Sequence, residues 1–164
     1  MTKTKTLIVL ATLVILAWLA NTWASPNDTV AYPSAYRKWV HVRSALVDPK
    51  SSAADRYGGL HHIYANDRAM EGYRTGQFPD GSVIVFDLLE TRESAGTTVE
   101  GPRKFIDVMT KDSQRYAETG GWEFEEFTGD NQRDPVLISQ GKTECYSCHA
   151  RQRSHDFVFS TFRK

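Results

Sequence analysis

The residues best suited to chemistry form one block, Cys145-Tyr146-Ser147-Cys148-His149, which contains both cysteines of the chain. The pattern C-x-x-C-H is that of c-type haem attachment. Two thiols at this separation can each add to one vinyl group of a porphyrin, and the following histidine can ligate the iron from the proximal side. The block therefore predicts one covalent haem c on Cys145 and Cys148, with His149 on the iron.

Three other interpretations of the cysteine pair remain open. Two cysteines in an oxidising compartment can form a disulfide. A thioredoxin-like dithiol belongs near a βαβ pattern, whereas this block lies near the end of the sequence with no such unit after it. A structural zinc ion needs four ligands, so His149 and a distant histidine would have to complete the site. None of these alternatives explains why both cysteines and a histidine fall in one short block.

The first residues predict export. Lys3 and Lys5 precede an apolar run over residues 7–20, and Thr22 and Ala24 supply the small side chains that a signal peptidase recognises. We expect residues 1–24 to be a secretory signal peptide and the periplasm to be the destination. An uncleaved membrane anchor is the alternative, but the run is shorter than the ~20 apolar residues that span a bilayer.

The remainder of the chain predicts one domain. The sequence has 164 residues, which gives room for one hydrophobic core. Residues 25–35 are polar with two prolines and form an expected lead-in, and residues 36–164 form the expected haem domain. Because 20 basic residues face 20 acidic ones, no basic excess is available to neutralise phosphates. Nucleic acid is therefore not an expected partner.

Hydrophobic patterns predict an α+β fold, in which an antiparallel sheet of about four to five strands carries flanking helices. Apolar spacing of three and four residues predicts a helix over residues 36–46, and a second helix is expected over 67–73. Residues 91–102 are polar and predict a connection. Alternating or β-rich runs predict strands at residues 60–65, 82–90, 104–110 and 122–127.

Other side chains could serve a haem iron. His61 and His62 lie on opposite faces of the strand expected at residues 60–65. Either imidazole could ligate the iron from the distal side or donate a proton, or could simply hydrogen-bond within a sheet. The further candidates for a sixth iron ligand are Met70, Met109, His41 and His155, and those for a proton acceptor are His62, Asp87 and Glu125.

Several segments together resemble the cytochrome P460 family. They are Trp39-x-x-Val42, His62-Ile63-Tyr64-Ala65-Asn66, Gly72-Tyr73, Phe78-Pro79-Asp80-Gly81-Ser82-Val83, Thr119-Gly120-Gly121-Trp122-x-Phe124, the C-x-x-C-H block and Asp156-Phe157-Val158-Phe159. The resemblance covers about residues 36–163. It implies an antiparallel sheet with flanking helices, one c-type haem and a homodimer.

The resemblance also implies one of two activities. P460 enzymes oxidise hydroxylamine and carry a lysine crosslinked to the porphyrin. Cytochromes c′-β lack the crosslink and bind gases such as nitric oxide at a five-coordinate iron beneath an aromatic cap. No lysine lies between Lys50 and Lys104, and the strand expected at residues 82–90 has Phe86 at its centre. Phe86 suits the distal cap, with an ordinary core position as the alternative.

We therefore expect a periplasmic mono-haem cytochrome with an open distal iron site. It would bind nitric oxide or a similar nitrogen-oxide or gas ligand, with a redox role and an unidentified periplasmic redox partner. Hydroxylamine oxidation is the alternative and needs a proton acceptor near the iron. Plain electron transfer comes third because it needs a second axial ligand, and a C-x-x-C thiol or zinc protein is a minor alternative.

Overall fold

Five strands form one antiparallel sheet in the order β1-β2-β3-β4-β5, so each strand pairs with its neighbours in the sequence. The computed structural model describes residues 30–137 and 139–163, and the predicted signal peptide lies outside them. In chain order the elements are η1 (Tyr36–Lys38), β1 (Val40–Val47), α2 (Ala54–Tyr57), β2 (Gly59–Ala65), α3 (Asp67–Thr75), β3 (Val83–Ser94), β4 (Thr97–Lys111), η2 (Ala117–Thr119), β5 (Trp122–Thr128), α4 (Ser139–His149) and η3 (Ala150–His155).

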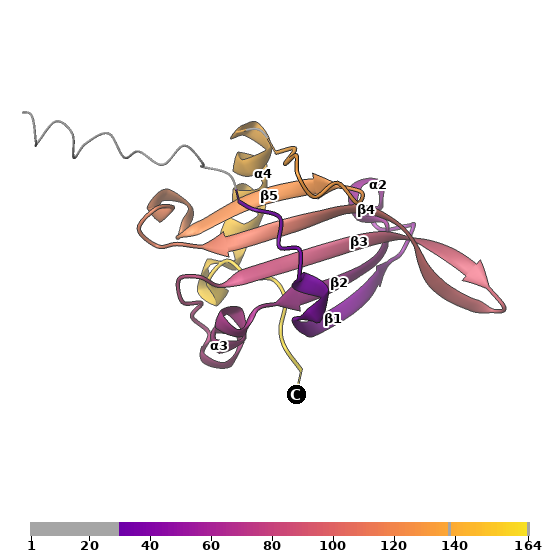
Figure 1. The fold of residues 1–164 in the computed structure, drawn as a ribbon, viewed down its shortest axis with the longest axis horizontal. Helices are drawn as coiled ribbons and strands as arrows, with labels where there is room; N and C mark the ends of the chain where they lie inside the picture. Colours follow the sequence, from indigo (N-terminus) through magenta and orange to yellow (C-terminus); the bar gives the residue numbers. More distant parts are fainter. Residues whose placement is uncertain (1–29, 138, 164) are drawn as a thin grey trace, which may run out of the picture.

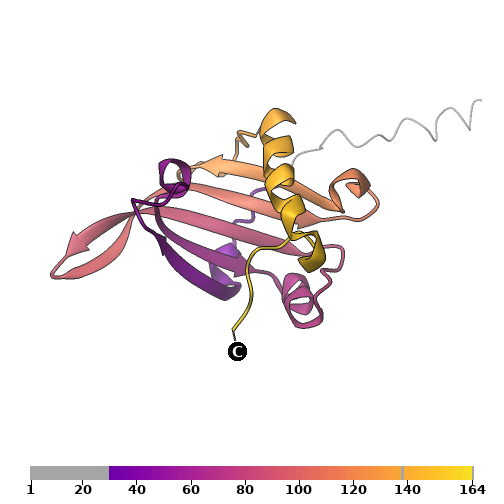
Figure 2. The same cartoon turned by 180° about the vertical axis from the view of Figure 1, so that it is seen from behind.

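Different segments cover the two faces of the sheet. Helix α4 and the residues after it lie across one face (Figure 2), here called the inner face. The segment before β1 crosses the opposite, outer face (Figure 1). The register assigns side chains to these faces, because directly paired residues share a face. The paired residues Ile63, Phe86 and Asp107 lie on the inner face, and His62, Asp87 and Ile106 lie on the outer face.

An ion pair fastens the C-terminal segment to the inner face. The Asp156 carboxylate lies 2.7 Å from Lys111 Nζ and also accepts a hydrogen bond of 2.8 Å from the Phe78 backbone N–H. Trp122 Nε1 donates to the Asp156 backbone carbonyl at 2.9 Å. The segment that follows α4 is thereby joined to β4, to β5 and to the turn before β3.

Strands β3 and β4 continue beyond the sheet as a protruding hairpin (Figure 1). Its turn residues Ala95 and Gly96 have φ of 50° and 79°, and positive φ at both positions is typical of type I′ turns, which match strand twist. The connection expected over residues 91–102 is therefore wrong. Polar side chains are compatible with strands here because both faces of the hairpin are exposed.

The helix expected over residues 36–46 is also wrong, because the chain makes one 3-10 turn and then enters β1. The β-branched residues Val40 and Val42 favour a strand, and β2 supplies the pairing partner. A bulge between His41 and Arg43 interrupts the alternation, which hides the strand from pattern analysis.

The other expected elements are confirmed. The four predicted strands correspond to β2, β3, β4 and β5, and the second helix is α3. Asn66 caps α3 by accepting a hydrogen bond of 2.9 Å from the Ala69 N–H, and Gly76 ends it with φ of 83°. Across residues 30–137 and 139–163, no helix is long and apolar enough to cross a membrane.

Candidate haem site

A cavity of about 600 Å³ lies between the inner face and α4. Helix α4 contributes Cys145, Cys148 and His149 to its lining, so all three residues predicted to hold the haem line one cavity. The two cysteines are three residues apart and therefore lie on the same side of the helix. The sheet supplies a largely apolar wall opposite them, formed by Ile63, Ile84, Phe86, Met109 and Phe124.

The environment of Cys145 disfavours a reactive thiolate. Burial raises the pKa of the Cys145 thiol to about 11, so this thiol is protonated at neutral pH. A dithiol redox centre needs the opposite, a stabilised thiolate. In the part of the chain that the structure describes, no three side chains of His, Cys, Asp or Glu converge to hold a metal ion.

His149 is prepared to ligate a metal through Nε2. Its Nδ1 donates a hydrogen bond of 2.7 Å to the Phe157 backbone carbonyl, which places the ring proton on Nδ1. The rings of Phe124 and Phe159 pack against the imidazole, each with its centroid 5.0 Å away. Burial lowers the pKa of His149, so the ring is neutral and Nε2 keeps its lone pair.

The carbonyl that orients His149 belongs to an unusual turn. Asp156 and Phe157 have φ of 49° and 67°, in the left-handed region that residues other than glycine rarely adopt. Such conformations persist where surrounding contacts hold them. Here the ion pair of Asp156 with Lys111 does so.

The sheet also contributes polar side chains to the cavity lining, among them His61 and Asp107. The His61 ring stacks on Phe86 with centroids 4.6 Å apart, and burial followed by the charge of Arg43 lowers the pKa of His61. Burial and the nearby Glu126 carboxylate raise the pKa of Asp107 well above its usual range. His61 Nδ1 and Asp107 Oδ1 are buried without a hydrogen-bond partner among the described residues. Both atoms are therefore available to a group bound in the cavity.

The sheet divides the candidates proposed from the sequence. His62 and Asp87 lie on the outer face, so their proposed role as proton acceptors at this cavity is wrong. The Glu125 carboxylate borders the cavity but already accepts a hydrogen bond of 3.0 Å from the Leu137 N–H. Of the proposed sixth ligands, the lining contains His61 and Met109 but not His41, Met70 or His155.

Asp107 was missed, although the sequence contains a signal for it. It alternates with the apolar residues Phe105 and Met109 in a strand that was expected, which makes it a carboxylate on an otherwise apolar face. Phe86 does line the cavity, as expected. Its role as a distal cap stays a prediction.

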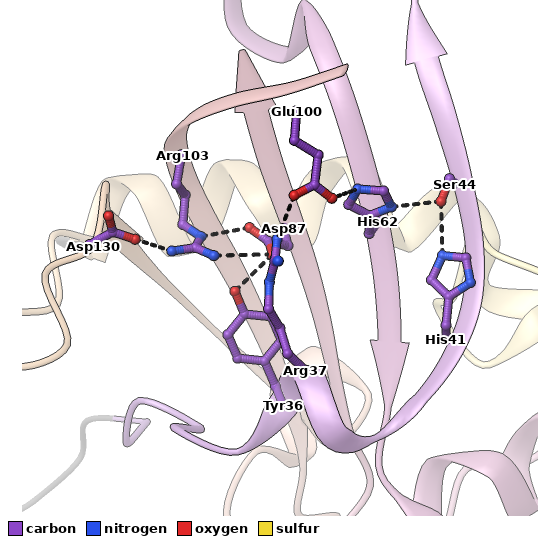
Figure 3. A network of polar contacts seen from close by, with 9 residues as sticks. All are labelled: Tyr36, Arg37, His41, Ser44, His62, Asp87, Glu100, Arg103 and Asp130. Atoms are coloured by element: carbon purple, nitrogen blue, oxygen red, sulfur yellow. Dashed lines mark hydrogen bonds and ion pairs between the residues drawn. The ribbon is translucent and has the colours of Figure 1, made fainter. Parts of the chain in front are cut away.

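Asp87 instead organises the outer face (Figure 3). Its buried carboxylate accepts hydrogen bonds from Tyr36 Oη at 2.8 Å, Arg37 Nη2 at 2.9 Å and Arg103 Nε at 2.7 Å. Burial alone would raise the pKa of Asp87, but the hydrogen bonds from Arg103 and Tyr36 hold it below its usual value. Asp87 therefore ties η1 to β3 and β4 as an ionised structural group.

The model of the Cytochrome P460 family matches residues 33–160. The chain belongs to the cytochrome P460 family. No curated protein matches the chain. Membership of the cytochrome P460 family implies a c-type haem, and the residues present fit that group. The cavity has a largely apolar wall on the sheet, two cysteines on one helix side and a neutral imidazole with a free nitrogen. Its described lining contains no lysine.

Proposed function

We propose that this cytochrome P460 family member is a mono-haem c-type cytochrome that binds nitric oxide or a similar small ligand at an open distal iron position. Cys145 and Cys148 would hold the porphyrin, and His149 would ligate the iron. The observation that carries the proposal is the hydrogen bond of 2.7 Å from His149 Nδ1 to the Phe157 carbonyl. It fixes the tautomer and leaves Nε2 as the only free nitrogen of a ring that lines the cavity.

The cavity walls support the choice of a small neutral ligand. When bound, the haem would supply the iron that takes the gas and exchanges electrons. The chain would supply a largely apolar sheet wall, in which Ile63, Ile84 and Phe86 exclude water. Phe86 is held between the His61 ring and the Phe105 ring, with centroids 4.6 and 6.3 Å away. This packing suits a rigid aromatic cap.

Hydroxylamine oxidation is the second candidate, and Asp107 favours it. Its unpaired Oδ1 and raised pKa describe a carboxyl group at the cavity whose protonated form is favoured by burial, and it could exchange a proton with a nitrogen-bearing ligand. Because no lysine is found in the described lining, the crosslink of the P460 enzymes has no evident donor. We therefore rank oxidation below gas binding. Electron transfer with His61 or Met109 as a sixth ligand is third.

The remaining proposals rest on the sequence. The N-terminal segment supports a periplasmic location, and the family resemblance supports a homodimer. A redox partner in the same compartment would exchange electrons with the haem.

Absorption spectra of the purified protein test the proposal. The oxidised, reduced and carbon monoxide-treated forms should show a high-spin c-type haem that takes up carbon monoxide. Cys145→Ser with Cys148→Ser should give protein without covalent haem, and porphyrin retained after denaturation would refute the attachment. His149→Ala should keep the haem but change its spin state, whereas the control His155→Ala should not, because that exposed ring lies outside the cavity.

The same spectra separate the alternatives. A strongly red-shifted reduced band would indicate a modified porphyrin and the hydroxylamine-oxidising branch. A low-spin spectrum that is indifferent to carbon monoxide would indicate a sixth protein ligand and an electron carrier.

A further inference from the structure

The outer face carries a pair of imidazoles that converge on one point (Figure 3). His41 Nε2 lies 2.8 Å from Ser44 Oγ, and His62 Nδ1 lies 2.6 Å from the same oxygen. The centroids of the two rings are 5.7 Å apart. One hydroxyl group on a sheet edge therefore stands between nitrogens from two neighbouring strands.

The bulge in β1 creates this arrangement. In a regular strand, residues three positions apart point to opposite faces, so His41 and Ser44 would lie on different sides of the sheet. The register shift after His41 instead pairs His41 with Tyr64 and Ser44 with His62. Since Tyr64 and His62 both belong to the outer face, the bulge turns His41 to the side of Ser44. Bulges commonly re-aim a side chain in this way at functional sites.

A carboxylate lies beside the second imidazole. His62 Nε2 lies 2.8 Å from Glu100 Oε1, and the other oxygen of Glu100 lies 3.5 Å from Arg37 Nη2. His62 Nε2 has no hydrogen-bond partner among the described residues, and Nδ1 is directed at Ser44 Oγ. The negative charge of Glu100 beside the ring favours a cation at this place.

We propose that His41 and His62 bind a divalent transition-metal ion at the position of the Ser44 hydroxyl, with Zn²⁺ and Cu²⁺ as the best-suited ions. Imidazole nitrogens suit both ions. They bind zinc at about 2.0–2.1 Å, so each ring needs to close by less than about 1 Å from its present contact with Ser44 Oγ. His41 is exposed, which gives the ion an approach from solvent.

Two histidine ligands predict a metal ion that exchanges with solvent rather than one that holds the fold together. Among the described residues no three His, Cys, Asp or Glu side chains converge on an ion, so water would complete the coordination. The site lies on the face opposite to the haem cavity, and the proposal does not depend on the function proposed above.

Calorimetric titration of the tag-free, chelator-treated full chain with Zn²⁺ tests the site. The chain is titrated as purified, with its haem attached, because cysteines bound as thioethers would not compete with the histidines for zinc. One ion should bind per chain. His41→Ala should weaken binding at least about tenfold, as expected for the loss of one of two protein nitrogens. Glu100→Gln should also weaken it, by removing a negative charge close to the ion. The matched control is His155→Ala, whose exposed ring belongs to no such pair and should leave binding unchanged.

Two further measurements identify the ligands. Ser44→Ala should retain binding, because both imidazoles remain. Bound Cu²⁺ should show nitrogen hyperfine splitting in electron paramagnetic resonance, and this splitting should be reduced in His41→Ala. Zinc binding that is absent from the parent chain, or unchanged in His41→Ala, would overturn the proposal. Because His41 is exposed, His41→Ala should fold like the parent chain. Urea unfolding without metal checks that the free energy of unfolding is unchanged.

Discussion

Replacement of Asp156 by asparagine should lower the free energy of unfolding by about 3 kcal/mol. Asp156 and Lys111 are each only 9% exposed at the side chain, so removal of one charge leaves the other buried. Loss of one partner of a buried pair destabilises proteins by roughly 3–5 kcal/mol. Asparagine keeps the shape of the side chain and tolerates the positive φ of this position, so the substitution tests charge rather than backbone strain.

The lower end of that range applies because Lys111 keeps two contacts. Its Nζ donates to the Gly120 carbonyl at 2.9 Å and lies 5.0 Å from the centroid of the Trp122 ring. The asparagine oxygen can also still accept from the Phe78 N–H. A loss of about 3 kcal/mol corresponds to a fall of roughly 9 °C in Tm for a domain of this size.

Urea unfolding followed by tryptophan fluorescence measures the change, with the midpoint shifting at constant slope. The double variant Asp156→Asn/Lys111→Met is the control. It removes both charges and should recover about 2 kcal/mol relative to Asp156→Asn, because the apolar replacement leaves no unpaired ion. The haem spectrum of the single variant should also change, since the turn that presents the Phe157 carbonyl to His149 loses its anchor.

A loss below about 1 kcal/mol would show that water reaches Lys111 and that the pair is not effectively buried. A double variant as unstable as the single one would show that the charge of Lys111 is not responsible. Either result would refute the view that this ion pair holds the turn beside His149.

Three further predictions concern other buried positions. Asp87→Asn should lower the free energy of unfolding by about 3 kcal/mol at pH 7. Because hydrogen bonds from Arg103 hold the pKa of Asp87 down despite burial, this difference should shrink below pH ~3.9, and a pH-independent difference would contradict the ionised form. Burial raises the pKa of Asp107, so its ionisation opposes folding increasingly above pH ~3.9. Asp107→Asn should therefore leave the free energy of unfolding unchanged or raise it at pH 8. Urea unfolding at pH 5 and pH 8 measures this. A large loss of stability at pH 8 would contradict the view that burial favours the protonated form of Asp107. Gly72→Ala should destabilise by about 2 kcal/mol despite the better helix propensity of alanine, because its Cβ would lie 2.2 Å from the Phe78 ring. Thermal unfolding measures this loss. Gly76→Ala is the comparison, because an added Cβ meets no atom within 4 Å there, so any loss of stability reports the strain of its positive φ alone.

The sequence determined the chemistry of the attachment block and much of the sheet. Cys145, Cys148 and His149 are adjacent in the chain, so their mutual geometry is local and follows from the motif alone. The opposite facing of His61 and His62 is also local, since it needs only the alternation of a strand. The two β-rich runs at residues 82–90 and 104–110 were predicted as strands, and the structure pairs them antiparallel as parts of β3 and β4.

The tertiary structure decided which face of each strand meets the haem cavity. Alternation separates Asp87 from Phe86 and Asp107 from Ile106, but it does not say which set lies under α4, because that depends on contacts across the whole chain. For this reason Asp87 was proposed as a cavity residue and Asp107 was missed.

The bulge in β1 shows the same limit more sharply. A single extra residue changes the face of every side chain beyond it, and only pairing with β2 fixes where it occurs. The convergence of His41 and His62 on Ser44, and the reach of the Phe157 carbonyl to His149, are likewise products of long-range packing. Local pattern sets what each side chain can do, and the register of the folded sheet decides which of them meet.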